Sequence, residues 1–370
     1  MNSKNIQTEL SDSLKPLVAI KRGDLIEKVH FGAYCIVEND YDPIYFFGNS
    51  EFITYTRSTA KPFQALSVIL SEADEKFNLN EKDIAIISSS HFGQPEHVLQ
   101  VKSILEKIGL KYEDLLCPAV YSRDNNTKYE QIRSGLEPSK YFCDCSAKHA
   151  GMLAACKALG YDIKDYDSPS HPLQILIKNI LSSIYDFDID KMIIGVDGCG
   201  VPVFSATLKS MAHAYLSLIN GKLNDNQTKR FENIGFAKKE VELALKKVRN
   251  SMVGNPSMIA GDSGICTVLM TLYGGSLVGK IGADGVYCVG LKDFATNHSI
   301  GIAVKIADGS MDALEFAVVS ILKRLNCLVS TRSNFIDRFL YKKCFNEHGI
   351  PVGEYQFLDG DLPSLASLLI

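Results

Sequence analysis

Ser58 and Lys61 are the first two residues of this sequence whose types and spacing suggest chemistry. Residues three apart share one face of a helix, so a hydroxyl at 58 would lie beside an amine at 61. Pro62 fixes the start of that helix, because proline lacks a backbone N–H and is tolerated only in a first turn. Unpaired N–H groups at a helix start favour an oxyanion. The motif therefore predicts a serine nucleophile and a lysine base, provided that the lysine is neutral.

Chance is the competing explanation of this motif. Ser-x-x-Lys is a weak pattern, and it recurs at Ser320 and Lys323 inside the amphipathic run 311–325. No helix start lies beside the second copy, so we interpret it as part of a helix surface.

Two later segments strengthen the catalytic hypothesis. Ser90 follows a compact apolar run at 83–87 that predicts a buried strand, and Lys280 interrupts another apolar strand two residues before Gly282. Together with Ser58 and Lys61 their order resembles that of serine β-lactamases and penicillin-binding proteins, which carry Ser-x-x-Lys, a later serine and Lys-x-Gly. Two alternatives stay open: the serines are an ordinary turn, and Lys280 is a solvent-exposed charge on an edge strand.

Cysteines in polar or glycine-rich turns indicate a metal site. Cys143, Cys145 and Cys199 lie in such turns, and two distant turns can supply thiolates to zinc. Cys-x-Cys is not a usual ligand spacing, so we expect Cys143 or Cys145 to bind, but not both. The alternative is that all three are free thiols.

Composition narrows the class of protein. The 370 residues are 46% hydrophobic and 22% charged, which is typical of a globular chain. The net charge of −4 produces no positive electrostatic potential that would attract nucleic acid or an anionic membrane. No apolar run approaches a spanning length, and the first 15 residues lack a signal peptide's apolar centre. We therefore expect a cytoplasmic protein with no nucleic-acid or membrane partner, whose ten cysteines are reduced.

Hydrophobic periodicity predicts an α/β (α+β) fold. We expect a loose arm at 1–16, then one catalytic domain over 17–370, whose antiparallel sheet comes from about 17–50 and 276–310 and whose inserted helical lobe spans about 94–270. The segments expected as strands are 17–20, 32–37, 44–48, 83–87, 192–196, 277–282, 286–291 and 300–307. The segments expected as helices are 58–71, 94–108, 148–159, 172–183, 203–219, 238–248 and the run from 311, while 111–143 is expected to be irregular.

Five ordered motifs resemble those of the L-asparaginase II family of the Rhizobium type. They are 57–65 (RSTAKPFQA), 90–93 (SHFG), 145–153 (CSAKHAGML), 196–202 (VDGCGVP) and 280–286 (KIGADGV), within a resemblance covering about 17–327. The resemblance implies a fold similar to serine β-lactamases and glutaminases and a homodimer that turns L-asparagine into L-aspartate and ammonia.

Position by position, the resemblance assigns roles to residues of this chain. It implies two serine–lysine pairs, Ser58 with Lys61 and Ser90 with Lys280. It further implies zinc held by Cys145, Lys148 and Cys199 and substrate contacts from Arg57, His91, Asp197 and Cys266.

The chain also departs from the family pattern. Gln94 stands where a glutamate is expected, residues 261–264 (GDSG) replace a segment that usually carries an arginine, and Ala147 replaces a usual glycine. The rival hypotheses are a β-lactamase-like or peptidase-like serine hydrolase and a non-catalytic protein that binds zinc and an amino acid. The missing signal peptide weighs against the first, because those enzymes work outside the cytoplasm.

Overall fold

The computed structural model describes residues 12–38, 42–293, 298–328 and 334–369. The chain divides into two compact units: unit 1 comprises Met1–Thr54, Thr207–Leu216 and Gly279–Ile370, and unit 2 comprises Tyr55–Ala206 and Ser217–Val278. One catalytic domain over 17–370 stays a prediction. Of the arm expected at 1–16, residues 1–11 lie outside the described residues, and the first strand already begins at Lys15.

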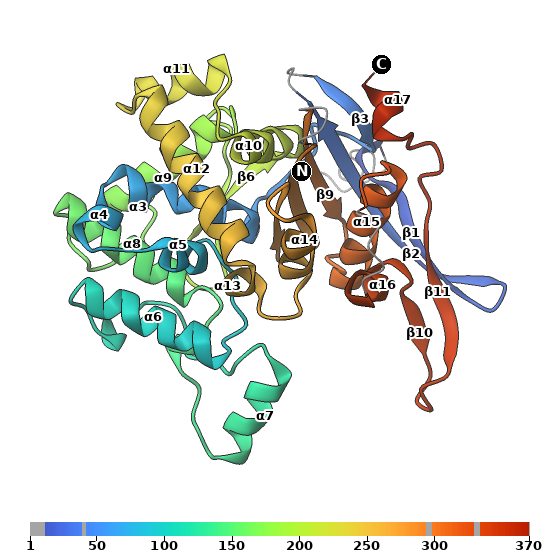
Figure 1. Ribbon diagram of the computed structural model, residues 1–370, viewed down its shortest axis with the longest axis horizontal. Coiled ribbons are helices and arrows are strands. Elements are labelled where there is room, and N and C mark those ends of the chain that lie inside the picture. Colours follow the sequence, from blue (N-terminus) through green and yellow to red (C-terminus); the bar gives the residue numbers. More distant parts are fainter. Residues whose placement is uncertain (1–11, 39–41, 294–297, 329–333, 370) are drawn as a thin grey trace, which may run out of the picture. The chain divides into compact units, whose positions relative to one another are not determined.

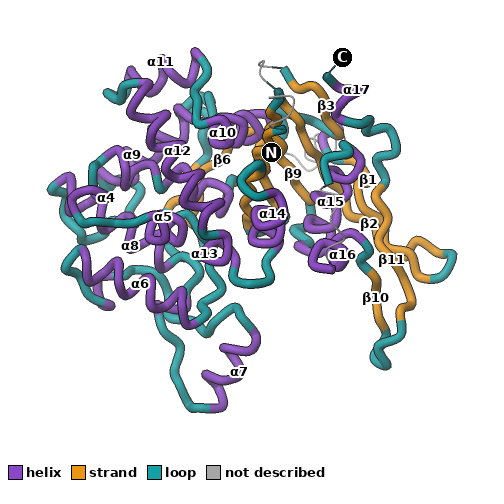
Figure 2. The backbone as a smooth tube through the Cα atoms, viewed as in Figure 1, coloured by secondary structure: helices purple, strands orange, loops and turns teal. Residues whose placement is uncertain are grey.

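Unit 1 is built on one antiparallel sheet, in the order β10-β11-β1-β2-β9-β8-β7 with β3 paired to β2 (Figures 1 and 2). Its strands are β1 (Lys15–Arg22), β2 (Leu25–Val37), β3 (Pro43–Phe47), β7 (Leu277–Gly282), β8 (Val286–Lys292), β9 (Ser299–Ile306), β10 (Lys343–Phe345) and β11 (Pro351–Phe357). The early and late strands expected from the sequence therefore form a single sheet, which confirms the predicted mixed α/β fold. β10 and β11 are additions that the sequence analysis did not include.

Helices pack against this sheet. α15 (Met311–Arg324) contacts β1, β8, β9 and β11, and α16 (Asn334–Leu340) and α17 (Leu365–Leu368) follow it. Gly301 of β9 allows the backbone around Ala212 to lie directly against the strand. A Cβ at position 301 would lie 1.9 Å from the carbonyl oxygen of Ala212. A side chain at 301 would thus push α10 (Leu208–Asn220), a helix whose first nine residues belong to unit 1, away from the strand.

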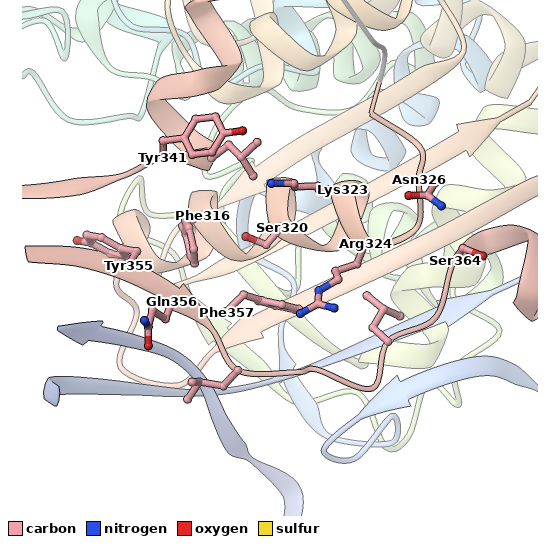
Figure 3. A pocket seen from close by; sticks show the side chains of 13 residues that line it. Phe316, Ser320, Lys323, Arg324, Asn326, Tyr341, Tyr355, Gln356, Phe357 and Ser364 are labelled. Atoms are coloured by element: carbon pink, nitrogen blue, oxygen red, sulfur yellow. The ribbon is translucent and has the colours of Figure 1, made fainter. Parts of the chain in front are cut away.

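A groove of about 900 Å³ opens over α15 and β11 (Figure 3). Phe316, Ser320 and Lys323 of α15 line it together with Tyr355 and Phe357 of β11. In the second Ser-x-x-Lys copy, Lys323 is exposed, as expected for a helix surface, whereas Ser320 is buried. Lys280 is not among the lining residues of this groove.

Unit 2 is mostly helical (Figure 2). Its α-helices are α2 (Lys61–Gln64), α3 (Leu66–Leu70), α4 (Ala73–Lys76), α5 (Glu81–Ile87), α6 (Pro95–Lys107), α7 (Asn125–Arg133), α8 (Ser146–Leu159), α9 (Pro172–Ile184), α11 (Asp225–Asn233), α12 (Lys238–Gly254), α13 (Pro256–Ala260) and α14 (Ile265–Tyr273). Its 3₁₀ helices are η1 (Arg57–Ala60), η2 (Tyr112–Asp114) and η3 (Lys140–Phe142). β4 (Ile53–Tyr55) leads into the unit, where β5 (Ile194–Val196) pairs with β6 (Pro202–Thr207).

Three local predictions for this unit are wrong. The run 83–87 is not a strand but the helix α5, which begins with a capping box between Asn80 and Asp83. The helix expected at 203–219 starts only at Leu208, because Pro202–Thr207 forms strand β6. The region 111–143 is not irregular throughout, since it contains α7.

Within the described part of the chain, every helix is too short or too polar to cross a membrane.

Candidate active site

Lys61 is a buried lysine at the start of α2, with 1% of its surface exposed. Pro62 follows it within the first turn, as the sequence predicts. The Lys61 Nζ atom donates a hydrogen bond to Ser90 Oγ at 2.9 Å and another to the Asp144 carbonyl oxygen at 3.2 Å. The lysine amine therefore contacts a serine hydroxyl, which is the arrangement that proton transfer requires.

Ser90 lies in a loop that two buried histidines hold in place. The Gly93 N–H donates to His91 Nδ1 at 3.1 Å, so His91 Nε2 carries the proton and donates to Ser146 Oγ at 2.9 Å. His91 also stacks on His97, with 5.4 Å between ring centroids. Burial lowers the pKa of both histidines, which keeps them neutral. His91 thus positions the loop beside the start of α8.

Arg57 and Asp197 form an ion pair beside the Ser58 motif. Arg57 Nε donates to Asp197 Oδ1 at 3.1 Å, and Asp197 Oδ2 lies 3.9 Å from Lys148 Nζ. Arg57 has a φ of 47°, in the left-handed region that costs a non-glycine residue energy. This backbone strain immediately precedes Ser58, as is common at functional sites.

Cys145, Asp197 and Cys199 bring their ligand atoms within 4.8 Å of one another. Two ligands at about 2.0–2.3 Å from one zinc ion lie at most about 4.6 Å apart, so these side chains fit a single ion after small adjustments. Lys148 Nζ lies 3.1 Å from Cys199 Sγ, at the same cluster. Cys143 does not belong to this group. That only one of Cys143 and Cys145 is a ligand stays a prediction.

Electrostatics at this cluster favour a thiolate on Cys145. Hydrogen bonds from Cys143 and Cys199 hold the pKa of the Cys145 thiol well below its usual value, although burial opposes this. Burial also works against the charged form of Lys148, but Cys145, Cys199 and Asp197 outweigh it and raise the pKa of Lys148. A deprotonated thiol and a nearby carboxylate are the donors that a zinc ion prefers.

A small pocket joins the two groups of residues within unit 2. Arg57, Lys61, Lys148 and Asp197 line it, together with Thr56, Ala60, Gln64, Pro202, Val203 and Phe204. The pocket residues Val203 and Phe204 come from β6, which the sequence did not predict to line a site because a helix was expected over 203–219. Lys61, Lys148 and Asp197 therefore lie around the same small space, whereas Cys145 and Cys199 are not among its lining residues.

Three predicted site residues stand apart from this arrangement. Ser58 is half-buried in η1, and among the described residues its hydroxyl has no hydrogen-bond partner. Cys266 is buried in the first turn of α14 and does not line the small pocket. Lys280 belongs to unit 1, where it is fully buried in β7 and its Nζ donates to the Ile281 carbonyl at 2.7 Å. The alternative of a solvent-exposed Lys280 is therefore wrong.

Two departures from the family pattern meet in the structure. Gln94 Nε2 donates to Asp262 Oδ2 at 3.2 Å, which joins the end of the Ser90 loop to residues 261–264. Both departures were visible in the sequence, but 168 positions separate the two residues and no local pattern indicates that they touch.

Similar solved structures include the Bacillus subtilis glutaminase YbgJ in covalent complex with 5-oxo-L-norleucine, with 11% identity, a TM-score of 0.33 and coverage of 78% of this chain and 87% of that chain. They also include a Bacillus glutaminase in 4.3 M NaCl, with 10% identity, the same TM-score of 0.33 and coverage of 78% and 90%.

Curated proteins gave no match. The family model of L-asparaginase II matches residues 18–357, which is most of the chain. Because that match spans most of its length, this chain belongs to the L-asparaginase II family of amidohydrolases.

Proposed function

We propose that this protein hydrolyses the side-chain amide of L-asparagine to L-aspartate and ammonia. The observation that carries the proposal is the 2.9 Å hydrogen bond from the buried Lys61 amine to the Ser90 hydroxyl. An amine in contact with a hydroxyl in a site shielded from water can move protons during acyl transfer. Membership of the family supports amide hydrolysis as the reaction class.

The proposed nucleophile is Ser58, one turn before Lys61. Its oxygen attacks the amide carbon while Lys61 removes the hydroxyl proton, and that proton leaves with the nitrogen as the C–N bond breaks. Water then hydrolyses the ester and restores the hydroxyl, releasing L-aspartate. Ser90 receives or returns protons through its bond to Lys61. A charge-holding role for Lys280, which belongs to unit 1, is assigned from the family resemblance alone.

Substrate recognition is assigned to charged groups of the pocket. Asp197 would bind the α-ammonium group, and Arg57 would bind the carboxylate while keeping Asp197 oriented. His91 holds the Ser90 loop, and Cys266 is assigned to the substrate region from the family resemblance alone.

Zinc is part of the proposal. Cys145, Lys148 and Cys199 would hold the ion, whose positive charge would help to orient the substrate. Lys148 must lose its proton for this role, against the anions that favour its charged form. We also propose that the enzyme works as a homodimer, as the family resemblance implies.

The test is ammonia release from L-asparagine, L-glutamine and a simple amide such as acetamide. We expect L-asparagine to be the best substrate and Ser90→Ala to be inactive. Ser89→Ala is the matched control, because Ser89 is equally buried and its hydroxyl has no hydrogen-bond partner among the described residues. Release from L-glutamine alone would overturn the substrate, and no release from any amide would overturn the activity.

A further inference from the structure

The groove over α15 and β11 is lined by none of the residues assigned to the candidate active site. Its volume of about 900 Å³ lies within the range of pockets that hold a small organic ligand. The 13 lining residues come mainly from α15, from β11 and from the segment 358–364 that follows β11 (Figure 3). All of them belong to unit 1, so the groove lies within one compact unit.

The charged side chains that line the groove are both cations. Lys323 and Arg324 lie in the last turn of α15, and no carboxylate is among the lining residues. Neither cation has an ion-pair partner among the described residues. The acidic residues of α15, Asp312 and Glu315, pair with Lys342 instead. The groove therefore favours an anion.

The end of α15 accounts for only part of this positive charge. The C-terminal end of a helix carries roughly half a negative charge, and basic residues commonly lie beside it. Two cations exceed what that end can neutralise, which leaves about 1.5 positive charges at the groove. Lys323 Nζ lies 5.3 Å from the centroid of the Tyr341 ring, a contact that attracts the ammonium group without neutralising it.

Ser320 adds a buried hydroxyl to the same face of α15. It precedes Lys323 by three residues and Arg324 by four, so the three side chains are neighbours on the helix. Ser320 is only 6% exposed, it lines the groove, and its hydroxyl has no hydrogen-bond partner among the described residues. A buried hydroxyl without a partner costs free energy, and a serine in a helix often avoids that cost by bonding to its own backbone. This hydroxyl is placed to donate to a ligand instead.

Aromatic rings supply the apolar part of the groove. Phe316 of α15 packs against Tyr355 of β11, with 5.5 Å between the ring centroids and 52° between the ring planes. Phe357 lies two residues further along β11, on the same face of the strand as Tyr355. Rings of this kind favour a ligand that carries a flat ring of its own.

We propose that this groove binds a phosphate monoester of a flat-ring compound, such as a mononucleotide. A phosphate monoester carries a charge of about −1.5 to −2 at pH 7, which matches Lys323 and Arg324, whereas a carboxylate would leave one of them uncompensated. The Ser320 hydroxyl donates to a phosphate oxygen, and the ring of the ligand packs on Tyr355 and Phe357. This site is additional to the proposed amide hydrolysis and does not depend on it.

Isothermal titration calorimetry with adenosine monophosphate (AMP), adenosine and inorganic phosphate tests the site. We expect the wild type to bind AMP, and to bind adenosine and phosphate at least about tenfold more weakly, because each supplies only part of the contacts. Lys323→Ala and Arg324→Ala should each weaken AMP binding at least about tenfold, since each removes a charged partner of the phosphate. Lys343→Ala on β10, an exposed lysine that does not line the groove, is the matched control and should bind AMP like the wild type.

Ser320→Ala separates ligand binding from folding. It should weaken AMP binding while the melting temperature stays unchanged, because the hydroxyl has no bond within the described chain to lose. The proposal is overturned if the wild type does not bind AMP at millimolar concentration, or if AMP binds the wild type, Lys323→Ala and Arg324→Ala equally well. Adenosine that binds as tightly as AMP would refute the role of the phosphate, and phosphate that binds as tightly as AMP would refute the role of the ring.

Discussion

Replacing Lys61 by methionine and by arginine separates a base from a fixed charge. Lys61 is fully buried and donates to Ser90 Oγ and the Asp144 carbonyl. Methionine has a similar length but neither donates nor accepts a proton. A positioned general base typically contributes about 100-fold to 10,000-fold in rate, so Lys61→Met should lose about 2.7–5.4 kcal/mol of transition-state stabilisation.

Arginine keeps the positive charge but cannot give up its proton at working pH. Lys61→Arg should therefore lose about as much activity as Lys61→Met. The double variant Lys61→Met with Ser90→Ala should be about as slow as either single variant, because members of one proton network fail together.

The assay is the ammonia release rate from L-asparagine, recorded beside a thermal unfolding curve for each variant. Lys323→Arg, in the second Ser-x-x-Lys copy, is the matched control and should retain full activity. Lys61→Arg with a rate within tenfold of the wild type would show that Lys61 acts as a fixed charge. The serine–lysine mechanism would then be wrong.

Three further outcomes follow from the same residues. Elemental analysis should find about one zinc per chain. Cys199→Ser should lower the zinc content, whereas Cys143→Ser should not, because Cys143 lies outside the cluster of ligand atoms. An unchanged zinc content in Cys199→Ser would exclude Cys199 as a ligand. Lys280→Ala should abolish most hydrolysis, whereas the exposed Lys343→Ala on β10 should not; equal rates for the two would end the role of Lys280. Burial lowers the pKa of His149 to about 3. Below about pH 6.5 the unfolded chain therefore binds a proton at His149 that the folded chain does not bind, and the free energy of unfolding should fall by about 2 kcal/mol from pH 6.5 to pH 5 because of this group. Urea unfolding of His149→Gln should show a correspondingly smaller loss over the same pH range.

Local patterns predicted the sheet better than they predicted short apolar runs. The alternation in 300–307 and the turns between the early strands indicate strands that the structure places in one sheet. The run 83–87 has too few residues to separate a strand from a buried helix by periodicity alone. The capping box of Asn80 and Asp83 was the signal that would have identified α5.

The contacts of the site depend on tertiary structure, which spacing does not encode. The sequence placed Lys61 beside Ser58, one turn away, because helical geometry acts over three or four residues. The bond to Ser90 spans 29 positions and depends on how α2 and the Ser90 loop pack. The pairing of Gln94 with Asp262 was invisible for the same reason. The sequence could indicate that the cysteine-bearing turns come together only because thiolates from distant turns can bind the same metal ion.

The two buried lysines of unit 2 have different neighbours. Lys148 lies 3.9 Å from the Asp197 carboxylate and 3.1 Å from the Cys199 sulfur, and these neighbours favour its ammonium form. Lys61 contacts a serine hydroxyl and a backbone carbonyl instead, and no carboxylate of the described residues lies within ion-pair distance of it. Our proposal therefore gives proton transfer to Lys61, which contacts the Ser90 hydroxyl, and places Lys148 with the cluster of Cys145, Asp197 and Cys199.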